Sequence, residues 1–176
     1  MAVYPVAYSE FPIPPSSAYP QGRTARRPIL QISLISGTNR LSCYAVVDSG
    51  ADHCVFPRSF IQPLGLDVLG APIELTSGMG SANVPTHFFN ISIDLQNVVR
   101  IPVYAGFTVG LDQMGVGLLG QSGFFDRFNV HFKLQRGIYE IDVPWQPLKP
   151  TPAPSSPGNH FPTPSLSLNT SIPARD

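Results

Sequence analysis

Polar and apolar residues alternate along much of the chain, and a period of two predicts β-strands. The alternation is clearest in residues 90–95 and 129–135. Gly137 allows a turn after the second of these stretches, and the polar residues 36–40 have the composition of a hairpin turn. The predicted strands are residues 29–35, 41–47, 90–95, 98–104, 129–135 and 138–143.

Helical signals are few, so the pattern predicts an all-β domain with one or two short helices. Residues 57–61 have the composition of one helical turn. Residues 124–128 are expected to form a short helix that Ser122 is placed to cap. Pro102 has no backbone N–H to donate, which confines its position to a strand edge or a bulge.

The prolines divide the chain into three parts. Six of the 20 prolines fall in residues 1–28 and nine in 144–176, which leaves five for the 115 residues between them. We therefore predict a Pro-rich, disordered segment at 1–26, one folded domain at 27–143 and a disordered Pro/Ser-rich tail at 144–176. The first segment carries aromatic residues, with which it could instead dock as an extended arm.

The charge balance excludes several classes of partner. Eleven Lys+Arg and 11 Asp+Glu give a formal net charge of zero, so no basic field exists for nucleic acid or an anionic membrane. No stretch approaches the roughly 18 uncharged apolar residues of a spanning helix. A basic start followed by an apolar run, the mark of a secretory signal, is also absent. We expect a cytoplasmic protein without nucleic-acid or membrane partners.

The histidines and cysteines show no pattern of a metal site or of a nucleophile. None of the four histidines has the spacing of a zinc ligand. His53 is adjacent to Cys54 in a predicted strand, so the two side chains point to opposite faces. Cys43 and Cys54 form either one disulfide or two buried thiols. The glycines at 78 and 80 do not precede a helix, so no phosphate loop and no cofactor are expected.

An acidic residue follows directly after an apolar strand at Asp48-Ser49-Gly50. A buried carboxylate is costly unless hydrogen bonds compensate it, and Ser49 and Gly50 supply N–H groups and a hydroxyl beside it. Gly50 also allows a sharp turn. By itself, the tripeptide is more easily explained as an Asx-type turn that caps an ordinary hairpin.

A second segment changes this interpretation. Val116-Gly117-Leu118-Leu119-Gly120 is followed by residues 121–128, about 70 positions after Asp48. With residues 46–51, these segments resemble the retropepsin-like aspartic proteases, the family that includes the retroviral proteases. The family pattern is an apolar run with Asp-Ser/Thr-Gly-Ala, a glycine-rich flap hairpin, two apolar residues with a Gly, and then a short helix and closing strands. The resemblance covers residues 27–143 and implies a closed all-β barrel.

The resemblance implies a role for each matched residue. Asp48 would be the catalytic acid, with Ser49 and Gly50 supporting the active site. Residues 76–81 stand where the tip of the flap would be, although an ordinary flexible hairpin remains the alternative. The substrate-binding residues would be Ala51, Asp52, Ser77, Gly78, Met79, Gly80 and Ser81.

The resemblance further implies an aspartic-type endopeptidase in which two carboxylates activate one water. Because the chain contains one Asp-Ser-Gly, the second carboxylate would be Asp48 of another copy in a homodimer that acts on a polypeptide substrate.

One residue departs from the family pattern. Retroviral members usually have Arg where Gln121 stands, paired with the acid that corresponds to Asp52. Here the contact with Asp52 would be a neutral hydrogen bond, or would come from Arg127.

Two other functions are compatible with the same residues. The chain could be a non-catalytic retropepsin-like module that dimerises or binds peptides, which the unusual Gln121 allows. It could also be a small β-barrel adaptor that presents its Pro-rich tail to SH3- or WW-like partners. The presence of Asp48, Ser49 and Gly50 together favours the enzyme.

Overall fold

The computed structural model describes residues 2–78, 81–96 and 98–144 of the chain. Met79, Gly80 and the predicted tail from residue 145 lie outside this part. The strands are β1 (Ala2–Ala7), β2 (Ser9–Ile13), β3 (Arg23–Arg27), β4 (Ile29–Ser36), β5 (Asn39–Val47), β6 (Val55–Pro57), β7 (Ile73–Gly78), β8 (Ser81–Leu95), β9 (Val99–Thr108), β10 (Gly117–Leu119), β11 (Asn129–Lys133) and β12 (Ile138–Val143). Three short 3-10 helices are η1 (Arg58–Phe60), η2 (Val109–Leu111) and η3 (Leu134–Arg136).

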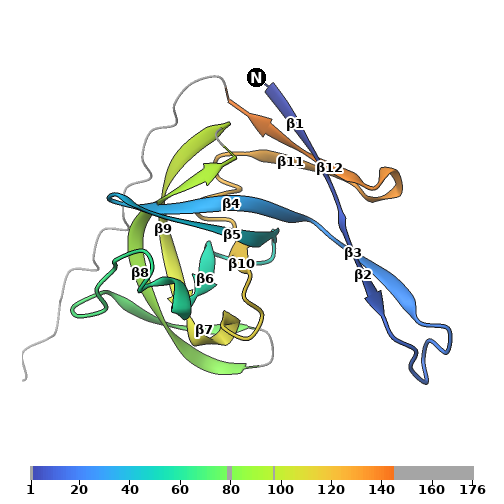
Figure 1. Cartoon of the computed structure of the whole chain (residues 1–176), viewed down its shortest axis with the longest axis horizontal. Helices are drawn as coiled ribbons and strands as arrows, with labels where there is room; N and C mark the ends of the chain where they lie inside the picture. Colours follow the sequence, from blue (N-terminus) through green and yellow to red (C-terminus); the bar gives the residue numbers. More distant parts are fainter. Residues whose placement is uncertain (1, 79–80, 97, 145–176) are drawn as a thin grey trace, which may run out of the picture.

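The largest sheet closes on itself. Its strand order is β4-β5-β10-β6-β9-β8-β7, and β8 also pairs with β4. The second pairing of β8 runs from Ser33 opposite Asp94 to Ile35 opposite Ser92 and joins the two ends of a six-stranded barrel, with β7 outside it (Figure 1). The prediction of an all-β closed barrel is therefore confirmed.

The barrel core consists of the apolar positions of the alternating pattern. On β9, Ile101, Val103, Ala105 and Phe107 are all at most 3% exposed. The sheet pleat sends every second side chain to one face, so a period of two in the sequence becomes a continuous apolar wall. Pro102 lies between Ile101 and Val103. At this position β9 pairs with β8 on one side, while its pairing with β6 on the other side begins only at Gly106. Its position on a locally free edge agrees with the prediction.

One buried carboxylate connects two hairpins of the barrel. Asp94 on β8 is 3% exposed. Its Oδ2 lies 3.2 Å from the Arg40 guanidinium, at the start of β5, and 3.6 Å from that of Arg100 on β9. A buried charge without a partner would be costly, so the two arginines allow this carboxylate to lie in the barrel wall.

The two predicted helices have different outcomes. Residues 57–61 contain η1, as predicted. Residues 124–128 form hydrogen-bonded turns, with the Phe128 N–H donating to the Phe124 carbonyl oxygen (3.0 Å), and no regular helix. The backbone of Ser122 pairs with that of His53 instead of starting a helix, and the single turn that remains is too short to propagate one.

The N-terminal segment differs from the prediction of disorder for residues 1–26. β1 pairs with β12 in a second sheet of order β1-β12-β11, and β2 pairs with β3 in a separate two-stranded ribbon. Tyr4, Val6 and Tyr8 stand at every second position, and their side chains pack against the core. Pro5 is tolerated because β1 is an edge strand. The end of the predicted domain at residue 143 stays a prediction.

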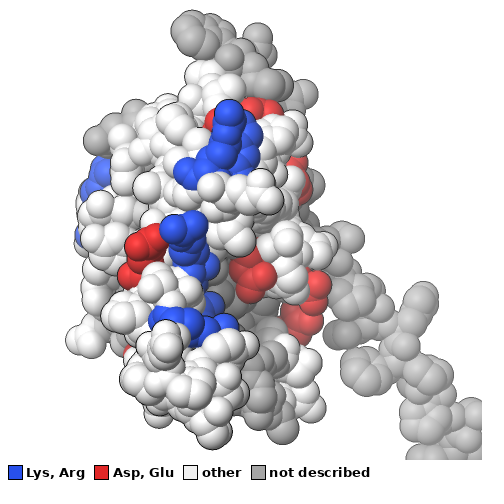
Figure 2. All heavy atoms as spheres, turned by 90° about the vertical axis from the view of Figure 1, so that its right-hand side faces the viewer, with Lys and Arg blue, Asp and Glu red and all other residues white. Residues whose placement is uncertain are grey.

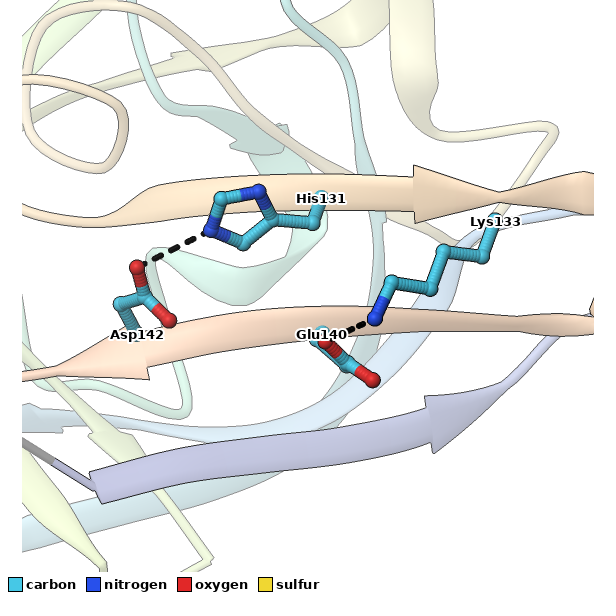
Figure 3. A network of polar contacts seen from close by, with 4 residues as sticks. All are labelled: His131, Lys133, Glu140 and Asp142. Carbon is cyan, nitrogen blue, oxygen red and sulfur yellow. Dashed lines mark hydrogen bonds and ion pairs between the residues drawn. The ribbon is translucent and has the colours of Figure 1, made fainter.

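On β11 and β12, the outer face of the three-stranded sheet carries two polar contacts (Figure 3). His131 Nε2 lies 3.0 Å from Asp142 Oδ2, and the Lys133 ammonium donates to the Glu140 carboxylate. Cross-strand polar pairs of this kind contribute about 0.2–1 kcal/mol each. The opposite face carries Tyr139 and buries it completely against the barrel. The sheet therefore has one face for solvent and one for the core.

Charged side chains are dispersed on the side of the molecule that carries β2 and β3. Figure 2 shows Lys and Arg in separate groups, with Asp and Glu between them. On β2 and β3, Arg26 pairs with Glu10 at 2.8 Å, and the Arg23 guanidinium lies 4.7 Å from the centre of the Tyr19 ring. No helix in the part of the chain that the structure describes has the length and apolarity to cross a membrane.

Tyr139 provides a test of how the second sheet is attached to the barrel. Its hydroxyl donates to the Ile29 carbonyl oxygen of β4 (3.0 Å), and its ring meets Tyr8 edge to face. Burial raises the pKa of Tyr139. We expect Tyr139→Phe to lower the free energy of unfolding by about 1 kcal/mol, because it removes one buried hydrogen bond. Tyr44→Phe, at a residue that is 54% exposed, is the matched control, and chemical denaturation measures both. An equal effect of the two substitutions would contradict this attachment.

Candidate active site

Asp48 is the first residue after β5, at a tight turn. Its N–H donates to the Leu119 carbonyl oxygen (3.0 Å), and its own carbonyl oxygen accepts from the Ala51 N–H (3.2 Å). The Gly50 N–H donates to Asp48 Oδ1 (2.9 Å), which is an Asx-type turn. Asp48 is half-buried. The turn therefore fixes a carboxylate at the end of a buried strand while leaving it accessible.

A parallel strand pairing brings the two sequence segments together. β10 pairs in parallel with β5, with Leu118 opposite Val46 and Leu119 opposite Val47. On its other side, Leu118 faces Val55 of β6 in an antiparallel bridge. β10 thus lies between the strand that precedes the Asp48 turn and the strand that follows it. The apolar residues that the sequence analysis matched to the family pattern are the ones that form this contact.

The chain after β10 then binds the chain after Asp48. The Gln121 N–H donates to the Ala51 carbonyl oxygen (2.8 Å), and the Ser122 N–H donates to that of Asp52 (2.8 Å). At Gly120, a Cβ atom would lie 2.3 Å from the His53 carbonyl oxygen and 2.6 Å from the Ala51 carbonyl oxygen. Only glycine permits this approach of two backbones.

The Gln121 side chain has a different partner from the one that the sequence analysis expected. Its Nε2 donates to the Ser49 carbonyl oxygen (3.0 Å) and not to Asp52. Arg127, the alternative partner of Asp52, has its Nε 3.8 Å from Oδ1 of the neighbouring Asp126. Backbone carbonyl groups carry no sequence signal, so the contact with Ser49 could not be predicted.

The predicted site residues fall into two groups. Asp48, Ser49, Gly50, Ala51 and Asp52 share the one turn. Ser77 and Gly78 end β7, and Ser81 begins β8 in the hairpin where the flap was predicted, with Gly78 paired to Ser81. Met79 and Gly80 lie outside the described residues. Within the described part of the chain, no hydrogen bond joins the turn to this hairpin.

An aromatic contact, which the sequence analysis missed, joins the segment after the Asp48 turn to β8. The His53 ring meets the Phe88 ring edge to face, with centroids 5.4 Å apart. Phe88 lies on β8, in the strand that carries the hairpin, and stacks on Tyr104 of β9 at 5.2 Å. The barrel wall therefore fixes the segment after Asp48 relative to the root of the hairpin. Aromatic residues in a β-barrel are usually core, so no sequence signal singled out Phe88.

Both cysteines are free and buried. Burial raises the pKa of each thiol to about 12, and for Cys54 a hydrogen bond from the Gly120 backbone only partly offsets this effect. Both thiols therefore stay protonated at neutral pH, and neither is a nucleophile. Of the two arrangements left open by the sequence, the structure has buried thiols and not a disulfide. In the described ranges, no three His, Cys, Asp or Glu side chains gather in a way that could hold a metal ion.

Comparison with known proteins identifies a family model that matches this region. A model described as "Aspartyl protease" matches residues 35–122, which are 88 of the 176 residues, or half of the chain. The match includes the Asp48 turn, the β7–β8 hairpin and β10. Among solved structures, the crystal structure of a retropepsin-like aspartic protease from Rickettsia conorii is 13% identical with a TM-score of 0.48, and the similarity covers 75% of this chain and 98% of that chain. No curated protein matches the chain.

The close approach at Gly120 gives a direct test of how the site is assembled. We expect Gly120→Ala to lower the free energy of unfolding by about 2 kcal/mol or more, because the added methyl would overlap two backbone oxygens. Gly110→Ala is the matched control, since its Cβ would meet only Thr108 side-chain atoms at 3.7 and 3.9 Å. Chemical denaturation measures both variants. If Gly120→Ala is as stable as Gly110→Ala, the contact between the two backbones does not support the turn.

Proposed function

This chain belongs to the aspartyl protease family, and we propose that it is an aspartic endopeptidase that cleaves polypeptides as a homodimer. The observation that carries the proposal is the setting of Asp48. A half-buried carboxylate stands at the end of an apolar strand, and the Gly50 N–H fixes its Oδ1 at 2.9 Å. This hydrogen bond holds the carboxylate in one orientation, and a carboxylate is a group that can accept a proton from water.

Peptide hydrolysis by this class of site uses two carboxylates and one water. The ionised carboxylate accepts a proton from the water, and the resulting oxygen nucleophile attacks the peptide carbonyl carbon. The protonated carboxylate donates to the carbonyl oxygen. When the C–N bond breaks, the departing nitrogen takes the proton that the first carboxylate accepted from the water, and a hydroxyl group of the intermediate returns a proton to the second carboxylate. Two carboxylates a few ångström apart do not both ionise readily, so such a pair shares one proton.

The second carboxylate would come from Asp48 of another copy. The chain contains one Asp-Ser-Gly, and the barrel is a single lobe with one such turn in its described part. A two-fold axis beside the turn would bring the two Asp48 side chains together. Ser49 is exposed next to Asp48, which supports the role that the family resemblance implies for its hydroxyl, a hydrogen bond across this axis.

The substrate would be an extended polypeptide. Gly50, Ala51 and Asp52 line the turn beside the carboxylate, and Asp52 is exposed. We assign to them the polar contacts with the substrate backbone. Ser77, Gly78 and Ser81 of the β7–β8 hairpin, together with the proposed substrate-binding residues Met79 and Gly80, would cover the bound peptide and exclude water from the reaction.

Asp48→Asn tests the proposed catalyst. The substitution keeps the size of the side chain and removes its ability to accept a proton, so we expect cleavage of a peptide library to fall at least about a thousandfold. Asp67→Asn is a matched control, because the Asp67 carboxylate also accepts a backbone N–H two residues ahead (2.9 Å) but lies outside the site. It should retain wild-type turnover.

The same experiment separates the enzyme from the non-catalytic module. Equal turnover by wild type and Asp48→Asn would exclude Asp48 as the catalyst. Absence of turnover in both proteins, at a concentration at which dimers form, would favour a module that dimerises or binds peptides.

Activity should also depend on protein concentration. If each subunit supplies one carboxylate, the rate per molecule falls as dilution shifts the equilibrium from dimer to monomer. Initial rates across a dilution series, compared with the dimer fraction from analytical ultracentrifugation, measure this dependence. A rate per molecule that stays constant well below the dissociation constant of the dimer would show that a single subunit holds a complete site.

A further inference from the structure

The peptide group between Ser49 and Gly50 is held from both sides. Its carbonyl oxygen accepts from Gln121 Nε2 (3.0 Å), and its N–H donates to Asp48 Oδ1 (2.9 Å). Residue 121 is therefore connected to the proposed catalytic carboxylate through a single peptide unit, although 73 positions separate it from Asp48 in the sequence.

The planarity of the peptide bond couples these two hydrogen bonds. The C=O and N–H groups of one peptide unit lie in one plane and point in opposite directions, so a rotation of the plane moves both. A donor that fixes the carbonyl oxygen also fixes the direction of the N–H. Hydrogen bonds in such a chain polarise one another, so the contact with Gln121 also strengthens the Gly50 N–H as a donor.

Gln121 is itself well anchored through its backbone. Its N–H donates to the Ala51 carbonyl oxygen (2.8 Å), and its carbonyl oxygen accepts from the Asp126 N–H (3.0 Å). The preceding Gly120 lies in close contact with the backbone of His53. The side chain thus reaches Ser49 from a point that the barrel already fixes. These backbone bonds remain when the side chain of residue 121 is changed.

We propose that Gln121 is a positioning residue for the Asp48 carboxylate and acts through the Ser49–Gly50 peptide. The inference rests on the proposed function. The Ser49 carbonyl oxygen can only accept a hydrogen bond, so the role requires an N–H donor at residue 121. Gln121 supplies the donor without adding a charge next to the carboxylate.

Gln121→Met tests the proposal, because methionine has a similar length and no N–H donor. We expect kcat to fall about five- to tenfold, which corresponds to the loss of one ordinary hydrogen bond. Gln121→Arg, which retains N–H donors, should restore most of kcat. Gln113→Met, at an exposed glutamine outside the site, is the control and should match wild type.

A second measurement does not depend on turnover. Water-exchange NMR of the Gly50 amide should show several-fold faster exchange in Gln121→Met than in wild type or Gln113→Met, because the peptide plane is free to rotate. The thermal unfolding midpoint should stay unchanged, since the residue is exposed and its backbone bonds remain. Thus the role of Gln121 can be measured even if wild type proves inactive and the proposed function fails.

Three results would overturn the role of Gln121 while leaving Asp48 as the catalyst. One is a Gln121→Met protein with wild-type kcat. Another is unchanged exchange of the Gly50 amide. The third is a fall in kcat that comes with a lower unfolding midpoint and that Gln121→Arg does not restore, which would indicate a merely structural role.

Discussion

The parallel pairing of β5 with β10 is the interaction on which the candidate site depends. It gives the Asp48 N–H its acceptor at Leu119 and brings Gln121 to the turn. Parallel strands require a long crossover, and here the crossover between Val47 and Gly117 includes β6, β8 and β9, three of the six barrel strands. The site therefore depends on contacts between segments that are distant in the sequence, and it is not a local property of the Asp-Ser-Gly turn.

Two glycines show how local and long-range constraints meet at this turn. A Cβ at Gly50 would lie 3.2 Å from Asp48 Oδ1, within the turn itself, whereas one at Gly120 would overlap the backbone of a distant segment. The first glycine allows the N–H to reach the carboxylate. The second allows the chain after β10 to bind Ala51 and Asp52. Neither position needs a left-handed backbone, so the requirement for glycine comes from close approach and not from strain.

The alternation of side chains was sufficient to predict the strands, because strands such as β9 bury every second residue from Ile101 to Ala105. The closure of these strands into a barrel was implied by the family resemblance. The prediction of disorder at β1 rested on the high proline content, and it did not use the alternation of Tyr4, Val6 and Tyr8. This segment forms a strand because β12 offers an edge with which its backbone pairs, and because Tyr139 offers a surface on which Tyr8 packs. The family pattern identified Asp48 and singled out Gln121. It could not show that Gln121 contacts a backbone oxygen, since tertiary structure decides which carbonyl groups come within reach.

The two parts of the proposed active site differ in how firmly the fold holds them. The Asp48 turn is bonded to β10 and to the segment after it, inside a closed barrel. The hairpin is supported on one side only, because β7 pairs with β8 alone among the described strands, and Ile73 and Leu75 on it are 59% and 61% exposed. Segments with few buried contacts open at lower free energy than the core. A protease of the proposed kind needs this difference, because the carboxylate must stay fixed while the hairpin admits and covers an extended polypeptide.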